Sequence, residues 1–343
     1  MIRATLFLLA ALVALSSATF IDNMVPRLSS KGEIMDSHDF SLRKYPGVEG
    51  YIMCSIAYGE CKEPPRQGCD QTPDHCGFQL NHTINIWQSN DLSSGSWSHI
   101  TTAVSLDNRP PGTIYRPDAI WNPHTQNVVL WYNWLNLQGV YEGYAAYTAP
   151  TPAGPFTRVR ERVNVTIQNS TENCGDFHLF LDPADGTPYV IAGCGFHMWI
   201  ERLLPNMLDS AGDTSPTGRY LFSEYFIEAP ALFFREGTYY AVFGSCCCYC
   251  FQGSGAIVHT APHPLGPWTL QGDIACVPSP NEEYRQALGL SATPTPGQGC
   301  QHVDPTTTSA MRSQQSFIAA VDTPTGPEFI WVRFCFAVCP AAL

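Results

Sequence analysis

The stretch FIEAPALFFREGTYYAVFG, residues 226–244, predicts a β-hairpin with an acidic residue at its entrance. Apolar residues occupy 231–234, a turn-forming Arg-Glu-Gly follows, and β-branched and aromatic residues occupy 238–243. Pro230 fits only near the start of such a strand, because proline cannot donate a ladder hydrogen bond. We therefore expect Glu228 to lie at the mouth of a strand.

Four other stretches repeat this arrangement of a polar residue, an apolar residue about three positions later, a turn and a second apolar run. The polar residues that open them are Asp39, Asp118, Asp176 and Gln314. Together with the hairpin of Glu228, they make five similar units along the chain.

A second repeat gives the length of one unit. Ser or Thr is followed by Gly six residues later and by an aromatic residue eight residues later in the segments 89–97, 148–156 and 260–268. Their starts lie 59 and 112 residues apart, and 112 is two periods of 56. One unit without this signature therefore fits in between, and it is the unit that Asp176 opens.

Repeats of this length, each with about four strand-like runs, predict an all-β fold, a five-bladed β-propeller. The innermost strand of each blade lines the axis of a propeller, so the five polar residues should converge at one end of the channel. The expected blades are 33–105, 112–165, 172–215, 224–276 and 310–338.

Residues 1–18 have the layout of a secretory signal peptide, with Arg3, an apolar run and small residues at the end. We expect residues 19–343 to form a single propeller domain, since the repeats cross it without a long linker. Two insertions, the Cys- and Pro-rich 61–81 and the Pro-, Thr- and Gly-rich 277–305, are interpreted as surface loops. The N-terminal apolar run is too short to cross a bilayer, and no other stretch approaches 18 uninterrupted apolar residues. We therefore expect a secreted, extracellular protein without a membrane partner.

The cysteine content agrees with export. All fourteen cysteines lie beyond the signal segment, and their even number predicts that all or nearly all are paired as disulfides. We favour disulfides over zinc for the cluster at 246–250 as well. Sequons at Asn81, Asn164 and Asn169 predict a glycoprotein.

The charge balance argues against nucleic acid as a partner. Without Arg3, 17 basic residues face 30 acidic ones, a net charge of −13, and no basic run could follow a phosphate backbone. Several carboxylates at one apolar-walled mouth repel one another, and burial disfavours their charged forms, so at least one should have a raised pKa. Glycoside hydrolysis uses such a group, because a protonated acid donates to the leaving oxygen while a base activates water.

At these residues the chain resembles glycoside hydrolase family 43, five-bladed propellers that act on plant-type polysaccharides, over essentially the whole mature chain. Glu228 followed by Ala-Pro-Ala-Leu-Phe matches the motif of the family's general acid. Asp176 followed by Phe-His-Leu-Phe matches that of its pKa-modulating aspartate, and Asp39 falls where the base aspartate belongs. The resemblance implies an inverting glycosidase that needs no cofactor.

Within that family the chain is most similar to the exo-β-1,3-galactanase branch, through Arg116-Pro117, the Glu228-Ala-Pro opening and Ser313-Gln314. In that branch the base aspartate is missing, and a glutamine that matches Gln314 takes its place. This chain has Asp39 where the branch has glycine. The base is therefore Asp39 or, alternatively, Gln314, and the polysaccharide is a β-1,3-galactan, an arabinan or a xylan-like polymer.

Six further residues are candidates for contact with the polysaccharide or oligosaccharide: Tyr115, Arg116, Asp118, Trp121, His38 and His178. Tyr115 stands where the galactanase branch has a substrate-contacting glutamate. For Asp118 a role other than direct substrate contact is favoured, and for Trp121 a place in the core between blades is favoured over stacking on a sugar. His302 with Asp304 could hold a structural calcium ion in the central channel. The alternative to an enzyme is a catalytically inactive propeller that binds glycans.

Overall fold

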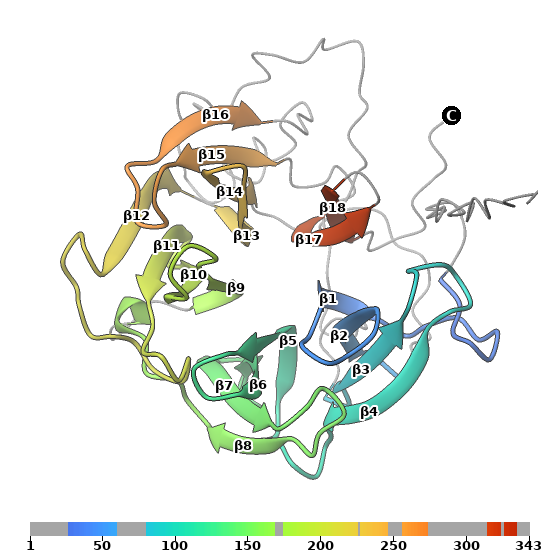
Figure 1. Ribbon diagram of the computed structural model, residues 1–343. Coiled ribbons are helices and arrows are strands. Elements are labelled where there is room, and N and C mark those ends of the chain that lie inside the picture. Colours follow the sequence, from blue (N-terminus) through green and yellow to red (C-terminus); the bar gives the residue numbers. More distant parts are fainter. Residues whose placement is uncertain are drawn as a thin grey trace, which may run out of the picture.

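The computed structural model describes residues 27–59, 80–168, 174–225, 227–245, 256–273, 314–323 and 326–334. Within these ranges the chain is built from β-strands and one short 3-10 turn, Thr166–Gln168. The strands form five antiparallel sheets around a common axis (Figure 1), of which four have four strands and the fifth has two in the described residues. The predicted all-β, five-bladed propeller is thus confirmed.

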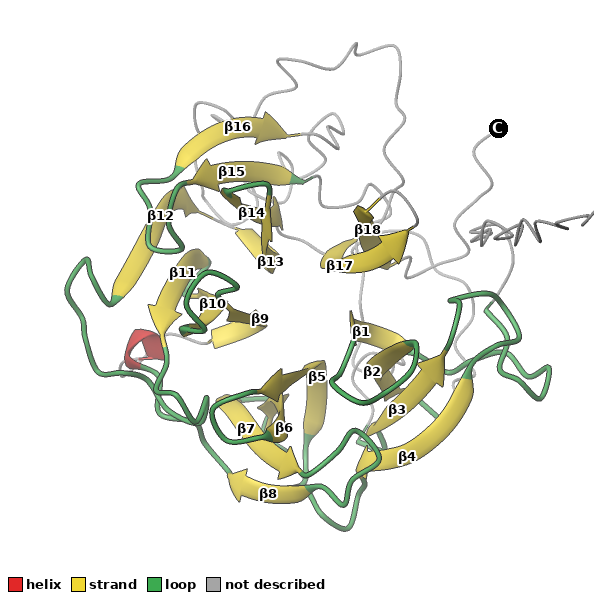
Figure 2. Ribbon diagram, in the orientation of Figure 1, coloured by secondary structure: helices red, strands yellow, loops and turns green. Residues whose placement is uncertain are grey.

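The strands follow the chain from the axis outward in every sheet (Figure 2). The first sheet contains β1 (His38–Arg43), β2 (Tyr51–Ala57), β3 (Thr83–Ser89) and β4 (Ser98–Val104). The second contains β5 (Thr113–Asn122), β6 (Asn127–Leu135), β7 (Tyr141–Ala149) and β8 (Thr157–Arg160). The third contains β9 (Cys174–Leu181), β10 (Pro188–Cys194), β11 (His197–Arg202) and β12 (Arg219–Tyr225). The fourth contains β13 (Ile227–Arg235), β14 (Thr238–Ser245), β15 (Ile257–Ala261) and β16 (Thr269–Asp273), and the fifth contains β17 (Gln314–Thr323) and β18 (Gly326–Phe334).

The hairpin predicted from residues 226–244 is confirmed as β13 and β14. Arg235 pairs with Thr238 across a two-residue turn, in which Glu236 and Gly237 have φ values of 49° and 81°. Two consecutive left-handed residues match the twist of the flanking strands, which is why this turn closes hairpins well. Glu228 is the second residue of β13, at the predicted strand entrance.

The third blade is longer than predicted. We expected it to end at residue 215, but its outer strand is β12, and Leu221 pairs with Trp199 of β11. The side chain of Phe222 is buried and packs against Phe243 of the fourth blade, with ring centroids 5.1 Å apart. The aromatic run around Phe222 therefore closes one blade rather than preceding the next.

The hydrophobic cores lie between neighbouring blades. Each of five clusters of buried side chains joins two adjacent sheets, and the fifth blade packs against both the fourth and the first. Trp131 is fully buried between the second and third blades, and its indole donates to the carbonyl of Met207 at 2.9 Å. Truncating such a residue typically costs about 3–5 kcal/mol. These contacts hold the inner strands in one ring.

The described residues contain one disulfide and one free cysteine. Cys174 of β9 and Cys194 of β10 form a cross-strand disulfide. Cys54 is a buried free thiol in β2, so it is an exception to the pairing predicted from the even count. In the described ranges, no helix has the length and apolar character needed to span a membrane.

Candidate active site

The inner strands share an irregularity at one end of the channel, which we call the mouth. The register of β1, β5, β9, β13 and β17 against its neighbour shifts there, as in a β-bulge. Asp39, Arg116 and Ala229 occupy equivalent places in three of these bulges, with φ values of 43°, 48° and 59°. Bulges re-aim side chains, and here they bring polar residues to the axis.

Arg116 lies at the centre of the mouth. Its side chain is buried, with Nε 3.1 Å from Oδ1 of Asp176 and Nη2 donating to Oδ2 at 3.3 Å. Its Nη1 donates to the hydroxyl of Ser316 on β17 at 2.7 Å. One guanidinium thus connects the second, third and fifth blades, which a planar group with five donors can do.

The charge of Arg116 depends on three carboxylates. Burial opposes it, but Asp176, Asp39 and Glu228 together hold the pKa of Arg116 above its ordinary value. These acids come from β9, β1 and β13, so three different blades contribute to one cluster. The structure therefore brings the three predicted catalytic residues together around a residue that was predicted to bind substrate.

The acidity of Asp39 is altered by its surroundings. Burial raises its pKa from 3.8 to about 6, with Arg116 lowering it and Asp176 raising it in smaller measure. A carboxyl group with a pKa of about 6 is mainly ionised at neutral pH and accepts a proton readily, which suits a general base. The cluster thus holds one carboxyl group suited to that role and, from Glu228, a second carboxyl group on another blade.

Gln314, the alternative base, begins β17, where its backbone pairs with Phe334. Its side chain lies outside the described part of the structure. The choice between Asp39 and Gln314 therefore stays a prediction. Ser316, two residues later, is the fifth blade's described contact with Arg116, and the sequence patterns did not point to it.

Asp118 lies one layer deeper along the axis and is a structural residue. Both of its oxygens accept from Nη2 of Arg43 at 2.9 Å, and Oδ2 also accepts from the amide of Leu179 at 2.7 Å. Its carboxylate is 4% exposed. Asp118 therefore connects the first three blades, two residues along β5 from Arg116, and its contact with substrate stays a prediction.

His178 belongs to the same deeper layer. Its Nδ1 accepts from the amide of Leu232 at 3.0 Å, and its ring packs edge-on against Phe317, with centroids 4.9 Å apart. Burial and the cations of Arg43 and Arg116 hold the pKa of His178 well below its ordinary value. The ring thus connects β9, β13 and β17, and its contact with substrate stays a prediction.

Arg43 was not predicted, although the sequence carried a signal for it. Its guanidinium contacts the carbonyls of Ala119 and Leu179 at 3.1 and 2.8 Å, in addition to Asp118. Ser41, two residues earlier, accepts from the amide of Ala119. Alternate residues of β1 face the axis after the bulge, so the period of two could have identified Arg43.

His38 and Tyr115 lie beside the mouth in a stack of rings. The ring of His38 stacks on Tyr58 with centroids 4.2 Å apart, and Tyr58 stacks on His82 at 4.4 Å. Tyr115 packs against the same Tyr58. Burial lowers the pKa of His38, and the positive charge of a protonated His82 would lower it further. Asp36 acts in the opposite direction and raises it in smaller measure. The structure keeps His38 and Tyr115 near Asp39 and Arg116, while Tyr58 and His82 were missed from sequence.

Trp121 does not join the mouth. It pairs with Val128 next to the β5–β6 turn, at the other end of the strand from Arg116. Its side chain packs against the core between the first and second blades. This packing supports the core role, and the contact of Trp121 with substrate stays a prediction.

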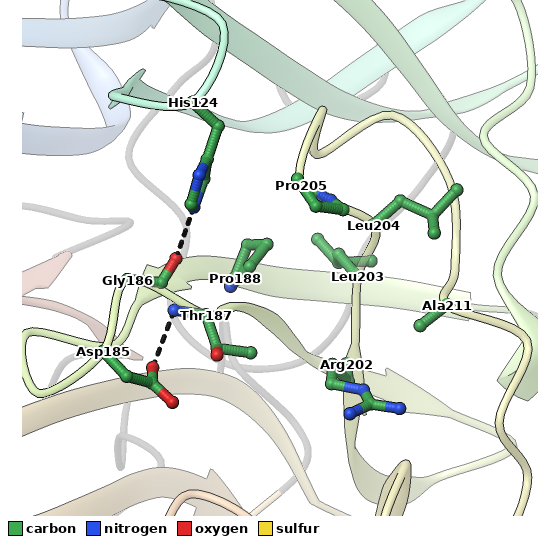
Figure 3. Close-up of a pocket in the computed structure, with 10 residues that line it drawn as sticks. All are labelled: His124, Asp185, Gly186, Thr187, Pro188, Arg202, Leu203, Leu204, Pro205 and Ala211. Atoms are coloured by element: carbon green, nitrogen blue, oxygen red, sulfur yellow. Dashed lines mark hydrogen bonds between the residues drawn. The ribbon is translucent and has the colours of Figure 1, made fainter.

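A separate pocket of about 260 Å³ lies at the opposite end of the second and third blades (Figure 3). His124, in the β5–β6 turn, donates to the carbonyl of Gly186 at 2.8 Å, and Asp185 accepts from the amide of Thr187 at 2.8 Å. These polar groups are bound to neighbouring backbone, so the pocket offers few convergent groups to a ligand. It is not part of the candidate site.

The described residues contain no group of three or more His, Cys, Asp or Glu side chains arranged to hold a metal ion. His302 and Asp304 lie outside those residues, so a calcium ion in the channel stays a prediction.

Solved structures with the same architecture are enzymes. An exo-β-1,3-galactanase from Clostridium thermocellum superposes with a TM-score of 0.64 at 19% identity, over 91% of this chain and 58% of that one. An exo-β-1,3-galactanase from Phanerochaete chrysosporium, with β-1,3-galactotriose, gives 0.60 at 15% identity, over 91% and 63%. A family 43 β-1,3-galactosidase with galactodeoxynojirimycin gives 0.60 at 18% identity, over 90% and 93%.

This is the fold of family 43 glycoside hydrolases. The predicted resemblance is confirmed at the level of the fold. The chain spans less than two thirds of the length of the two galactanases, and nearly all of the β-1,3-galactosidase. No model of a protein family matches the chain, and no curated protein matches it in sequence.

Proposed function

We propose that the protein is a secreted glycoside hydrolase that cleaves a β-1,3-galactan-like polysaccharide with inversion at the anomeric carbon. The observation that carries the proposal is the placement of Asp39, Asp176 and Glu228 on three inner strands around one buried arginine, Arg116.

In the proposed reaction, Glu228 donates its proton to the glycosidic oxygen as the bond to the anomeric carbon breaks. Asp39 accepts a proton from water, and the water oxygen attacks the opposite face of that carbon. Asp176, which is held in place by its ion pair with Arg116, takes the role of the pKa-modulating aspartate that its motif implies. Atoms balance, because one water is consumed and two hydroxyl groups are formed.

The substrate and the location rest on separate supports. The similar solved structures are named as galactanases and galactosidases, which favours β-1,3-galactan over arabinan or xylan. The apolar N-terminal segment and the disulfide between Cys174 and Cys194 favour an oxidising, extracellular environment. Asn164 is exposed, as a glycosylated sequon requires.

Incubation of the purified protein with β-1,3-galactan, arabinan and xylan tests the proposal. We expect release of galactose from the first, and proton NMR at early times should show the anomer opposite to that of the substrate linkage. Binding of galactan without any product would instead assign the chain to the glycan-binding propellers, and release from arabinan or xylan alone would correct the substrate.

A further inference from the structure

The hairpin between β10 and β11 lies on the mouth face between two of the proposed catalytic residues. Its base carries Cys194, which is bridged to Cys174, two residues before Asp176. At its tip, the carbonyl of Phe196 accepts from the amide of Ile227 at 3.3 Å, and Ile227 precedes Glu228. The hairpin is therefore tied both to the strand of Asp176 and to the strand of Glu228.

Phe196 occupies this tip in a conformation that its residue type disfavours. Its φ is 61° and its side chain is 50% exposed. A bulky residue in the left-handed region is a genuine outlier, whereas Gly or Asn would adopt it at lower cost. The turn between Cys194 and His197 requires a positive φ at both Gly195 and Phe196. The turn alone would therefore favour a residue such as Asn or Gly over a half-exposed phenylalanine.

The ring of Phe196 is nevertheless held in place. It packs edge-on against Tyr225, with centroids 6.0 Å apart and an interplanar angle of 75°. Tyr225 in turn packs against His197, with centroids 4.9 Å apart. An aromatic ring that is oriented by its neighbours and exposed beside a cluster of acids is suited to stack on the apolar face of a sugar.

We propose that Phe196 is the platform for the sugar on the leaving-group side of the scissile bond. This inference rests on the proposed function, because it takes Glu228 as the residue that protonates the leaving oxygen. The leaving sugar must lie beside that acid, and the bond from Ile227 places the Phe196 tip next to it. Phe196 thereby selects chains of two or more sugars over a single galactose.

The test measures binding in the Glu228→Gln background, where hydrolysis does not interfere. Calorimetry gives Kd values for galactose and for β-1,3-linked galactobiose and galactotriose, with and without Phe196→Asn. Aromatic contacts of this kind are worth about three- to tenfold in affinity, so we expect that loss for the two oligosaccharides and none for galactose. Phe196→Trp should retain the binding. Leu221→Ala, which removes an apolar side chain that is 43% exposed on the same blade, is the matched control and should change nothing.

Stability separates the platform from a packing role. Asparagine tolerates a positive φ, so Phe196→Asn should leave the melting temperature unchanged or raise it. Unchanged Kd values for the oligosaccharides, or a clear fall in melting temperature, would overturn the platform. If either of these outcomes is found while the wild-type protein still hydrolyses galactan, the platform fails and the proposed function stands. If it neither binds nor hydrolyses any galacto-oligosaccharide, the proposed function fails with it.

Discussion

Arg116 and Asp176 form a two-point ion pair across the second and third blades, with Nε 3.1 Å from Oδ1 and Nη2 3.3 Å from Oδ2. Arg116 is 5% exposed, so the pair is largely removed from water. Breaking one partner of a buried pair leaves an uncompensated charge. The cluster at the mouth therefore depends on the shape of this guanidinium as well as on its charge.

Arg116→Lys tests that dependence. Lysine keeps the charge but lacks the planar fork, so it cannot hold Asp176 at two points and Ser316 at a third. Misplacement of catalytic groups by about 1 Å can cost about 10²-fold, and we expect a fall in kcat of that order on galactan. Arg235→Lys, at an exposed arginine on the β13–β14 hairpin, should keep the wild-type kcat. A wild-type kcat for Arg116→Lys would contradict the role of the fork.

The ionisation of Asp39 should make the activity fall at acidic pH. A base works in its ionised form, and the pKa of Asp39 is raised to about 6, so kcat/KM should rise with pH through about 6 and then level. Asp39→Asn should remove most of the activity at every pH. If Gln314 is the base instead, Asp39→Asn will retain turnover and Gln314→Ala will abolish it.

The same pKa predicts an opposite effect on stability. The rise from 3.8 to about 6 corresponds to about 3 kcal/mol of unfolding free energy that is present below pH 3.8 and lost as the pH rises through 6. Asp39→Asn should therefore stabilise the protein by up to this amount above pH 7, and not below pH 4. Chemical denaturation at both pH values measures the difference, and equal stability at high pH would count against the buried carboxylate.

Removal of Arg43 should destabilise the whole ring. Arg43 is the cation that pairs with the buried Asp118, so Arg43→Met should cost about 3–5 kcal/mol in denaturant unfolding. Adding Asp118→Asn should recover part of the loss, because it removes the uncompensated charge. Lys44, the residue after Arg43, forms an exposed ion pair with Asp322. Lys44→Met breaks that pair and should cost less than about 1 kcal/mol of unfolding free energy. Similar losses for Arg43→Met and Lys44→Met would refute the axial role.

Cysteine labelling tests the free thiol. Cys54 is unpaired and buried, and the total of fourteen is even, so a second unpaired cysteine follows if all other bridges are intramolecular. Alkylation of unreduced, unfolded protein should label at least two thiols, and peptide mapping should find Cys54 among them. Native protein should leave Cys54 unlabelled. A peptide that carries Cys54 in a disulfide would contradict the structure.

The sequence predicted the fold well because the repeats record it directly. Each unit opens with a polar residue at the start of an inner strand, and that regularity placed Asp39, Asp176 and Glu228 on separate blades. It also counted Asp118 as their equivalent, whereas the structure pairs Asp118 with Arg43. The bulge in β5 turns Arg116 into the mouth and leaves Asp118 two residues deeper.

The bulges could not be predicted, since no glycine marks the left-handed positions. Asp39, Arg116 and Ala229 adopt positive φ values because the ring around them imposes it. Trp121 shows the same limit in another form. An aromatic residue in a propeller strand usually fills a core but can also stack on a sugar, and its register at the β5–β6 turn supports the core here.

The kinetics of Glu228→Gln test the central claim most directly. Glutamine keeps the shape of the side chain and removes the proton donor, and a positioned acid contributes about 10²- to 10⁴-fold. We predict a loss of that size in kcat/KM on β-1,3-galactan, and a much smaller loss on a dinitrophenyl β-galactoside, whose leaving group needs little protonation. Near-wild-type hydrolysis of galactan by Glu228→Gln, or equal losses on both substrates, would contradict the assignment of Glu228 as the acid.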